Sequence, residues 1–271
     1  MLTIYSTCKP FTDKHFAIIQ RNAIKSWLSI YPTPEIVLFG DDEGTAEVCR
    51  EFGIKHVPNI LCSEKGTPRL DAMMKEVEEL SDNPMFLLIS SDIILLKNVL
   101  EIADYCYHEF INFCASISRW DTVLNEEINF VTGWEEKLLP ECWFSHPWCG
   151  DFFLYTRNFF GPIPPFYIGR TGVDSWLYNK AAELGNLIDA TNFSKIIHQN
   201  HEPNQIGNTS KDQEEFEENV RLAGNNVASL ASANWYLLEN GKILSKQDFT
   251  EMVFNYFESK NDNHHNDLSE K

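Results

Sequence analysis

Continuous apolar runs that alternate with helical patterns constrain this chain more than any other feature of its sequence. Leu2 to Thr7, Glu35 to Phe39 and Met85 to Ile89 are short runs of the kind that forms strands buried on both faces. Between them, apolar residues recur at spacings of three and four, which predicts amphipathic helices. Strands separated by helices pair in parallel, because a parallel connection needs a crossover. The first half of the chain is therefore predicted to form a largely parallel α/β sheet.

Start and stop signals place the helices between these strands. Thr12 is predicted to cap the first helix, and Thr45 to Phe52 form a second helix that stops at Gly53. Thr67 and Pro68 are predicted to open a third helix, because proline is favoured in the first turn. The alternation of strand and helix thus continues as far as the apolar run at Met85.

The second half of the chain has a looser pattern. Residues 111–118 and 151–157 predict strands, and the long aromatic-rich connection between them favours a mixed sheet with long loops. After His201 the sequence turns polar. A helix is predicted at Gln213 to Ala223, followed by a hairpin with an Asn-Gly turn within residues 235–244 and a last helix.

These patterns divide the chain into three parts. Residues 1–207 are predicted to form the α/β domain, and residues 208–258 a C-terminal appendage of helices and a hairpin. Residues 259–271 show no apolar periodicity and are predicted to be a disordered tail.

Composition excludes several classes of partner. The 271 residues carry a formal net charge of −18, from 40 acidic and 22 basic residues, which opposes binding to nucleic acid and to anionic lipid surfaces. Seven cysteines form no Cys-x-x-Cys pair and mostly lie in apolar runs, which predicts reduced thiols and a cytoplasmic location. No transmembrane segment is predicted, because no segment approaches the ~18 consecutive apolar residues of a membrane span. The N-terminus also lacks the pattern of a signal peptide.

Polar residues stand where the predicted strands end. Asp92 closely follows the third apolar run, Ser6 and Thr7 end the first, and Asp41 and Asp42 closely follow the second. Ligands of open α/β sheets bind outside the carboxyl ends of the strands, so these side chains are expected to meet in one crevice. Taken singly, each also fits an ordinary turn or a helix cap.

The order of these pieces resembles the nucleotide-sugar-binding half of the GT-A-fold glycosyltransferases, particularly the inverting family 2 group. The matching strings are "VLFGDDEGTAEVCREFG", "KGTPRLDAMMKEVEEL" and "FLLISSDIIL". In that family an acidic pair holds the nucleoside, a Gly-to-Arg helix start faces the diphosphate, and an apolar strand ends in Asp-x-Asp. The resemblance implies that Asp41 and Asp42 are the acidic pair and that Gly66 and Arg69 are the helix start that faces the diphosphate. It implies that Asp92 is the last Asp of Asp-x-Asp and a metal ligand. Ser90 stands where the first Asp of Asp-x-Asp is expected. The donor-binding candidates are Ser6, Thr7, Asp41, Asp42, Arg69, Ser90 and Ser91.

The resemblance continues in the second half, through "CGDFFLYTRNFFGPIPPFYIGRTGVDSWL" to "SKIIHQNH". It implies that His198 is the second metal ligand, with His201 as the alternate, for Mn²⁺ or Mg²⁺. Asp174 matches the Asp of the family's Glu-Asp motif and is the candidate general base, while Val173 replaces the Glu. An ordinary helix N-cap is compatible with that role. Asp151 is the competing base or an acceptor contact.

The sequence therefore predicts a GT-A-like mixed sheet flanked by helices, with the C-terminal appendage. The predicted function is metal-dependent transfer of a sugar from a nucleoside-diphosphate sugar to a glycan or other hydroxyl acceptor, with inversion. A retaining outcome stays open, because the sequence does not fix the face that the acceptor approaches. A non-catalytic nucleotide-sugar or glycan-binding module of the same fold is the alternative. A sugar-phosphate nucleotidylyltransferase is disfavoured, because "STCKPFTDK" after the first strand has no glycine-rich loop.

Overall fold

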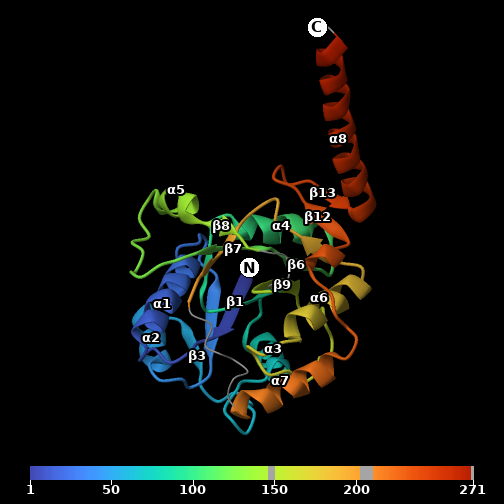
Figure 1. The fold of residues 1–271 in the computed structure, drawn as a ribbon. Coiled ribbons are helices and arrows are strands. Elements are labelled where there is room, and N and C mark those ends of the chain that lie inside the picture. Colours follow the sequence, from blue (N-terminus) through green and yellow to red (C-terminus); the bar gives the residue numbers. More distant parts are fainter. Residues whose placement is uncertain (146–149, 202–209, 270–271) are drawn as a thin grey trace.

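A computed structural model gives the fold of the chain and describes residues 1–145, 150–201 and 210–269 (Figure 1). Nine strands form the larger of two sheets. In spatial order they are β13 (Ile243–Ser245), β12 (Trp235–Leu237), β10 (Leu187–Asp189), β6 (Cys114–Ser116), β9 (Phe152–Thr156), β4 (Met85–Ile89), β1 (Leu2–Thr7), β2 (Glu35–Phe39) and β3 (Lys55–Val57). The strands β4, β1, β2 and β3 are parallel, whereas β9 pairs antiparallel with both β4 and β6.

A smaller sheet begins close to the carboxyl end of β4. It contains β5 (Ile93–Leu95), β11 (Ile196–Gln199), β7 (Arg119–Thr122) and β8 (Trp143–Phe144) in that spatial order. Its central strand β11 pairs antiparallel with β5 and parallel with β7. Since β5 directly follows Asp92 in the chain, this pairing brings the end of β11 beside the end of β4.

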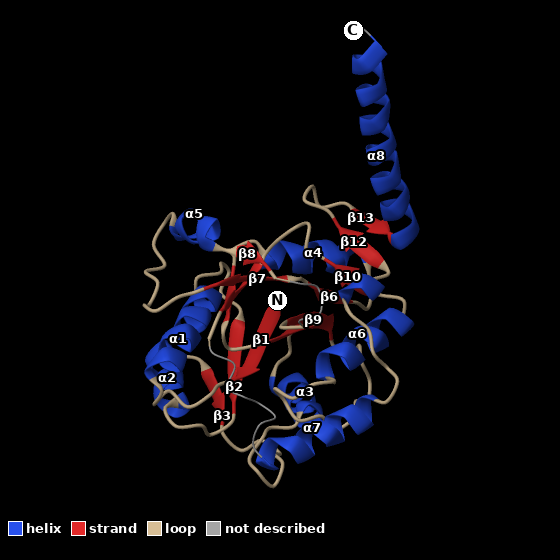
Figure 2. Ribbon diagram, in the orientation of Figure 1, coloured by secondary structure: helices blue, strands red, loops and turns tan. Residues whose placement is uncertain are grey.

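Helices cover both faces of the larger sheet (Figure 2). In chain order, the helices of the described residues are α1 (Lys14–Leu28), α2 (Thr45–Phe52), α3 (Leu70–Leu80), α4 (Val99–Glu109), α5 (Trp134–Leu138), α6 (Val173–Glu183), α7 (Ser210–Ala223) and α8 (Lys246–Ser269), with short 3-10 turns at Leu139–Glu141 and Leu230–Ser232.

The core divides according to the alternation of side chains along each strand. In β4, Leu87 joins a buried cluster with α1, α2 and α4, whereas Phe86 joins a second cluster with α3, α6 and α7. Both side chains are fully buried. A strand with apolar side chains on both faces therefore holds both helical layers, as its sequence predicts.

The starts of two helices differ from the prediction. Asp13 caps α1 in place of Thr12, because its side chain accepts hydrogen bonds from the backbone N–H groups of His15 and Phe16. The helix α3 begins at Leu70, not at Thr67. Residues 63–68 instead form a loop that folds back on itself, where the N–H group of Ser63 donates to the carbonyl of Thr67 at 2.8 Å.

The C-terminal region is continuous with the α/β domain. The hairpin β12–β13 extends the larger sheet through parallel pairing with β10. The helix α8 projects away from the rest of the molecule and runs to Ser269 (Figure 1), and the disorder predicted for residues 259–271 stays a prediction. The predicted boundary between residues 207 and 208 lies outside the described residues and stays a prediction.

Among the described residues, none of the helices combines the length and the apolar composition that crossing a bilayer requires.

Candidate functional site

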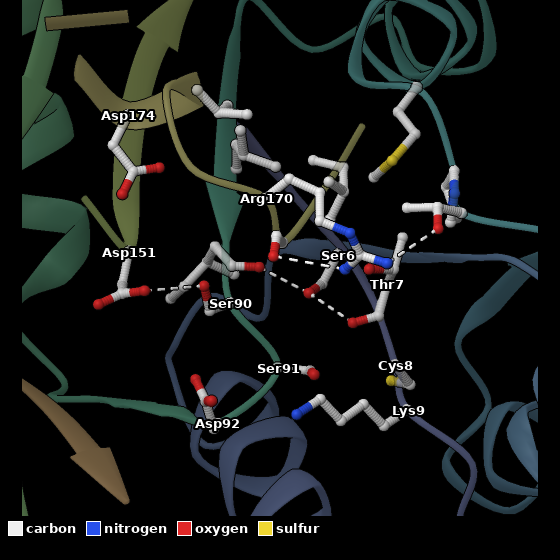
Figure 3. Close-up of a pocket in the computed structure, with 18 of the residues that line it drawn as sticks. Ser6, Thr7, Cys8, Lys9, Ser90, Ser91, Asp92, Asp151, Arg170 and Asp174 are labelled. Carbon is white, nitrogen blue, oxygen red and sulfur yellow. Dashed lines mark hydrogen bonds between the residues drawn. The ribbon is translucent and has the colours of Figure 1, made fainter. Parts of the chain in front are cut away.

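A pocket of about 690 Å³ opens at the carboxyl ends of β1 and β4 (Figure 3). The end of β1 and the residues after it contribute Ser6 to Pro10, the turn after β2 contributes Asp42, and the chain after β4 contributes Ser90 to Asp92. Residues 65–68 and 168–171 and the start of α6 also line the pocket, as do Arg119, Gly150, Asp151, His198 and His201. The strand order thus brings together most of the polar side chains that the sequence singles out.

Asp41 and Arg69 are not among the described residues that line this pocket. Asp41 is exposed, and Arg69 forms a two-pronged ion pair with Asp71, with nitrogen–oxygen distances of 3.0 and 2.6 Å. Asp42 does reach the pocket, and burial together with the charge of Asp41 raises the pKa of its carboxyl. The donor-binding roles of Asp41 and Arg69 stay predictions, without support from the positions of their side chains.

Asp92 lies between two histidines. Its Oδ2 atom is 3.6 Å from Nε2 of His198 in β11 and 3.2 Å from Nε2 of His201. Burial acts to raise the pKa of Asp92, but the hydrogen bonds and charges of the two histidines outweigh it and hold that pKa well below its ordinary value. The Oδ1 atom of Asp92 is buried without a hydrogen-bond partner among the described residues. The cluster therefore contains an acceptor atom that a bound cation would satisfy.

The separations within this cluster fit the ligand set of a divalent cation. Asp92, His198 and His201 each offer one ligand atom, and these atoms lie within 4.8 Å of one another. Two neighbouring ligands of an octahedral cation, each about 2.1 Å from it, lie about 3 Å apart. A set with two imidazoles suits Mn²⁺ better than Mg²⁺, which prefers oxygen ligands. The structure places the alternate ligand His201 in the same cluster as His198.

Asp121 in β7 supports His198 and is absent from the sequence-based predictions. Its Oδ1 atom lies 3.1 Å from Nδ1 of His198, and Oδ1 of Asn200 lies 2.9 Å from the same nitrogen. When Nδ1–H donates to these oxygens, Nε2 keeps its lone pair and faces Asp92. Burial acts to lower the pKa of His198, but the hydrogen bond and charge of Asp92 raise it overall.

A second acidic group lies in the same pocket, at the start of α6. Gly172 is the N-cap of this helix, so Asp174 lies in its first turn and is not the cap that the sequence suggested. The Oδ2 atom of Asp174 accepts a hydrogen bond from the backbone N–H of Gly150 at 3.3 Å. A side chain at Gly150 would place its Cβ only 2.7 Å from Cβ of Asp174, so this approach requires glycine.

Asp174 and Asp151 have different surroundings. Burial, together with the nearby charge of Asp151, raises the pKa of Asp174 to about 7. Asp151 accepts hydrogen bonds from Ser90 Oγ and from an Arg119 terminal nitrogen, each at 3.0 Å. Asp151 is thus held by a cation and a hydroxyl, whereas Asp174 has the pKa of a base that works near neutral pH.

Basic side chains complete the lining of the pocket. Lys9, Lys65 and Arg170 line it, although the chain as a whole is strongly acidic. The Nζ atom of Lys9 lies 4.1 Å from the ring centre of Phe16, and that ring packs against the imidazole of His201. Burial lowers the pKa of Lys9, against the raising effect of Asp92. Lys9 and Lys65 had no sequence signal, because single lysines near a strand end or in a turn are common.

Comparison with solved structures identifies the fold. Residues covering 83% of this chain superimpose on S. aureus TarS 1-349 in complex with UDP-GlcNAc, with a TM-score of 0.56 and 13% sequence identity. The same protein in complex with UDP gives a TM-score of 0.53 at 12% identity, over 83% of this chain. The chain has a GT-A-like fold. This confirms the fold and the resemblance that the sequence predicts.

The matches span 66% and 65% of those two TarS chains, just under two thirds of their length. A weaker likeness is to glucosyl-3-phosphoglycerate synthase from Mycobacterium tuberculosis, with a TM-score of 0.49, 14% identity, and 83% of this chain and 78% of that chain covered. No protein-family model and no curated protein sequence matches this chain.

Proposed function

We propose that the protein is a metal-dependent glycosyltransferase, which transfers a sugar from a nucleoside-diphosphate sugar to an acceptor hydroxyl with inversion. One observation carries the proposal: a single pocket of a GT-A-like fold contains the Asp92, His198 and His201 cluster and also an acid, Asp174, whose pKa is raised to about 7. The TarS structures support the donor class, because that protein is bound to UDP-GlcNAc in one and to UDP in the other.

In this proposal Asp92, His198 and His201 hold Mn²⁺ or Mg²⁺. The cation, when bound, stabilises the negative charge of the departing nucleoside diphosphate. Asp121 fixes the ring of His198 by accepting from Nδ1 at 3.1 Å, which leaves Nε2 directed at Asp92. The orphaned Oδ1 of Asp92 supports this assignment, because a buried carboxylate oxygen without a partner is costly.

Asp174 is proposed as the general base. Its carboxylate takes the proton of the acceptor hydroxyl as the oxygen attacks the anomeric carbon, and one such displacement inverts that carbon. A base with a pKa of about 7 is ionised in a large fraction of molecules at neutral pH and still binds a proton readily. Asp151, which accepts hydrogen bonds from Ser90 and Arg119, is proposed as a contact for the acceptor.

The donor is proposed to lie along the carboxyl ends of β1 and β4. Ser6, Thr7, Asp42 and Ser91 line this part of the pocket. Ser90 also lines it, but its hydroxyl donates to Asp151 and so differs from the ribose-binding Asp that the family resemblance leads one to expect.

That hydrogen bond is also the observation that favours the alternative, a non-catalytic nucleotide-sugar or glycan-binding module. Product release separates the two functions. A transferase incubated with its donor and acceptor releases nucleoside diphosphate at a rate that depends on Asp174, whereas a binding module retains the intact donor.

The test is a thermal-shift screen of a nucleotide-sugar panel, with Mn²⁺ and with EDTA, because a ligand that binds the native state raises the unfolding temperature. The proposal expects at least one nucleotide sugar to raise that temperature with Mn²⁺ and to do so less with EDTA. Hits are then incubated with candidate acceptors while released nucleoside diphosphate is measured. Absence of any stabilising nucleotide sugar contradicts the proposal.

A further inference from the structure

Helix α7 carries a buried carboxylate against the wall of the pocket. Only 4% of the Glu215 side chain is exposed. Its Oε2 atom accepts from Arg170 Nε at 3.0 Å, from a terminal nitrogen of Arg170 at 2.8 Å and from Thr67 Oγ1 at 2.8 Å. The Oε1 atom accepts from Ser63 Oγ. We refer to Glu215, Arg170, Thr67 and Ser63 as the Glu215 network.

The Glu215 network joins two separate loops that line the pocket. One loop, residues 63–68, contributes Lys65, Gly66 and Thr67 to the lining, and the other, residues 168–171, contributes Arg170. A buried carboxylate is stable only when donors compensate for its lost hydration. Since the donors come from both loops, the charge of Glu215 links their positions.

A second side chain on the same face of α7 fixes the helix against the residue that precedes the second loop. Asn219 lies four residues after Glu215, one helical turn further along. Its amide nitrogen donates to the carbonyl of Tyr167 at 2.9 Å, and its amide oxygen accepts from the N–H of Tyr167 at 2.9 Å. Asn219 is fully buried. Two buried polar side chains thus attach the helix to the segments that form the wall of the pocket.

The orientation of Arg170 shows what this attachment achieves. Its side chain extends over the pocket toward Ser6 and Thr7 (Figure 3). Its guanidinium also contacts Thr67 Oγ1 at 3.3 Å, so the cation is held between α7 and the loop 63–68. Because this guanidinium is already fixed, it loses little further conformational freedom when an anion binds. This favours its affinity for phosphate.

We propose that Glu215 is a positioning residue of the donor site: it holds Arg170 so that the guanidinium contacts the nucleoside-diphosphate part of the donor. This inference rests on the proposed function and assigns a role in it to α7, which lies beyond the part of the sequence that resembles the family. Glu215 itself accepts hydrogen bonds from protein groups only and acts through Arg170.

The test measures the dissociation constant of UDP by calorimetry in the presence of Mn²⁺, with GDP, CDP and ADP as further probes. Glu215→Gln keeps the size of the side chain and removes its charge. The expected result is affinity weaker by about 10- to 100-fold for the nucleotide that the wild type binds, the range for a lost hydrogen bond to a charged group. Glu218→Gln is the matched control on α7, because Glu218 is paired with Arg221 near the surface; its affinity should be unchanged.

A double-mutant cycle separates positioning from a general structural effect. In an Arg170→Lys background, Glu215→Gln should weaken binding by less than about 2-fold, because its effect passes through Arg170. An equal loss in both backgrounds overturns the inference, and so does unchanged affinity of the Glu215→Gln single variant. If Glu215→Gln does not fold, Glu215→Asp replaces it, since the shorter side chain keeps the charge but withdraws from Arg170. A wild type that binds none of the four nucleotides contradicts the proposed function instead.

Discussion

Replacing Asp174 by Asn should make the protein more stable above neutral pH while it removes transfer activity. Burial and the charge of Asp151 raise the pKa of Asp174 from the ordinary value of 3.8 to about 7. The unfolded carboxyl therefore ionises at a lower pH than the folded one. Between pH 4 and 7 the native Asp174 carboxyl binds more protons than the unfolded one, so its contribution to the stability falls across this window and is constant above it.

The size of the effect follows from the shift of about 3 pKa units. At about 1.4 kcal/mol per unit, the ionised carboxylate costs the native state about 4 kcal/mol. Asp174 is partly exposed to the pocket, and water there screens the charge, so about 2 kcal/mol is the expected difference in practice. Asn keeps an oxygen that can accept the hydrogen bond from Gly150 and carries no charge.

The assay is urea unfolding of the wild type and of Asp174→Asn from pH 4 to pH 8. The free energies of unfolding should be similar at pH 4 and should diverge as the pH rises, with the variant more stable by about 2 kcal/mol at pH 8. Glu218→Gln, which changes an acid near the surface of α7, controls for the loss of one negative charge. A constant difference between the wild type and Asp174→Asn across the whole pH range would refute the reasoning.

Asp174→Asn should also lower the rate of sugar transfer by roughly 10²- to 10⁴-fold, with nucleoside-diphosphate affinity retained. The wild-type rate should rise with pH through about 7. Near-normal turnover by Asp174→Asn beside an inactive Asp151→Asn would move the base to Asp151. Asp151→Asn should shift the pH profile toward acid, because the charge of Asp151 helps to raise the pKa of Asp174; an unchanged midpoint speaks against this coupling. Asp92→Ala should abolish Mn²⁺-supported UDP binding without unfolding the protein, and normal binding would remove Asp92 from the metal site. Asp121→Asn should weaken Mn²⁺ affinity by roughly 10- to 100-fold, because the ring of His198 loses its carboxylate partner; wild-type affinity in a Mn²⁺ titration would show that Asp121 has no such role.

Local sequence signals predict the strands of the first half of the chain with accurate boundaries. The continuous apolar runs become β1, β2 and β4 at the predicted residues, because strands buried on both faces tolerate few other side chains. Helix starts were less accurate: Asp13 and Thr12 are both good caps, and only the backbone geometry decides between them.

The candidate site was predictable where a motif places a residue at a strand end, as for Asp92. It was not predictable where the chemistry depends on contacts distant in sequence. Asp121 lies 77 residues from His198, and Glu215 lies 148 residues from Thr67. The role of Arg69 was implied by the family resemblance, and a matching motif does not reveal that Asp71 binds this side chain.

The most direct test of the account is calorimetric titration of the wild-type protein with UDP, and with GDP, CDP and ADP, in Mn²⁺ and after chelation with EDTA. The account predicts saturable binding of at least one of these nucleotides with Mn²⁺ and a markedly lower affinity after chelation, because Asp92, His198 and His201 form one cluster in the pocket. Equal affinity with Mn²⁺ and with EDTA would contradict the metal site, and absence of binding by all four nucleotides would contradict the proposed function itself.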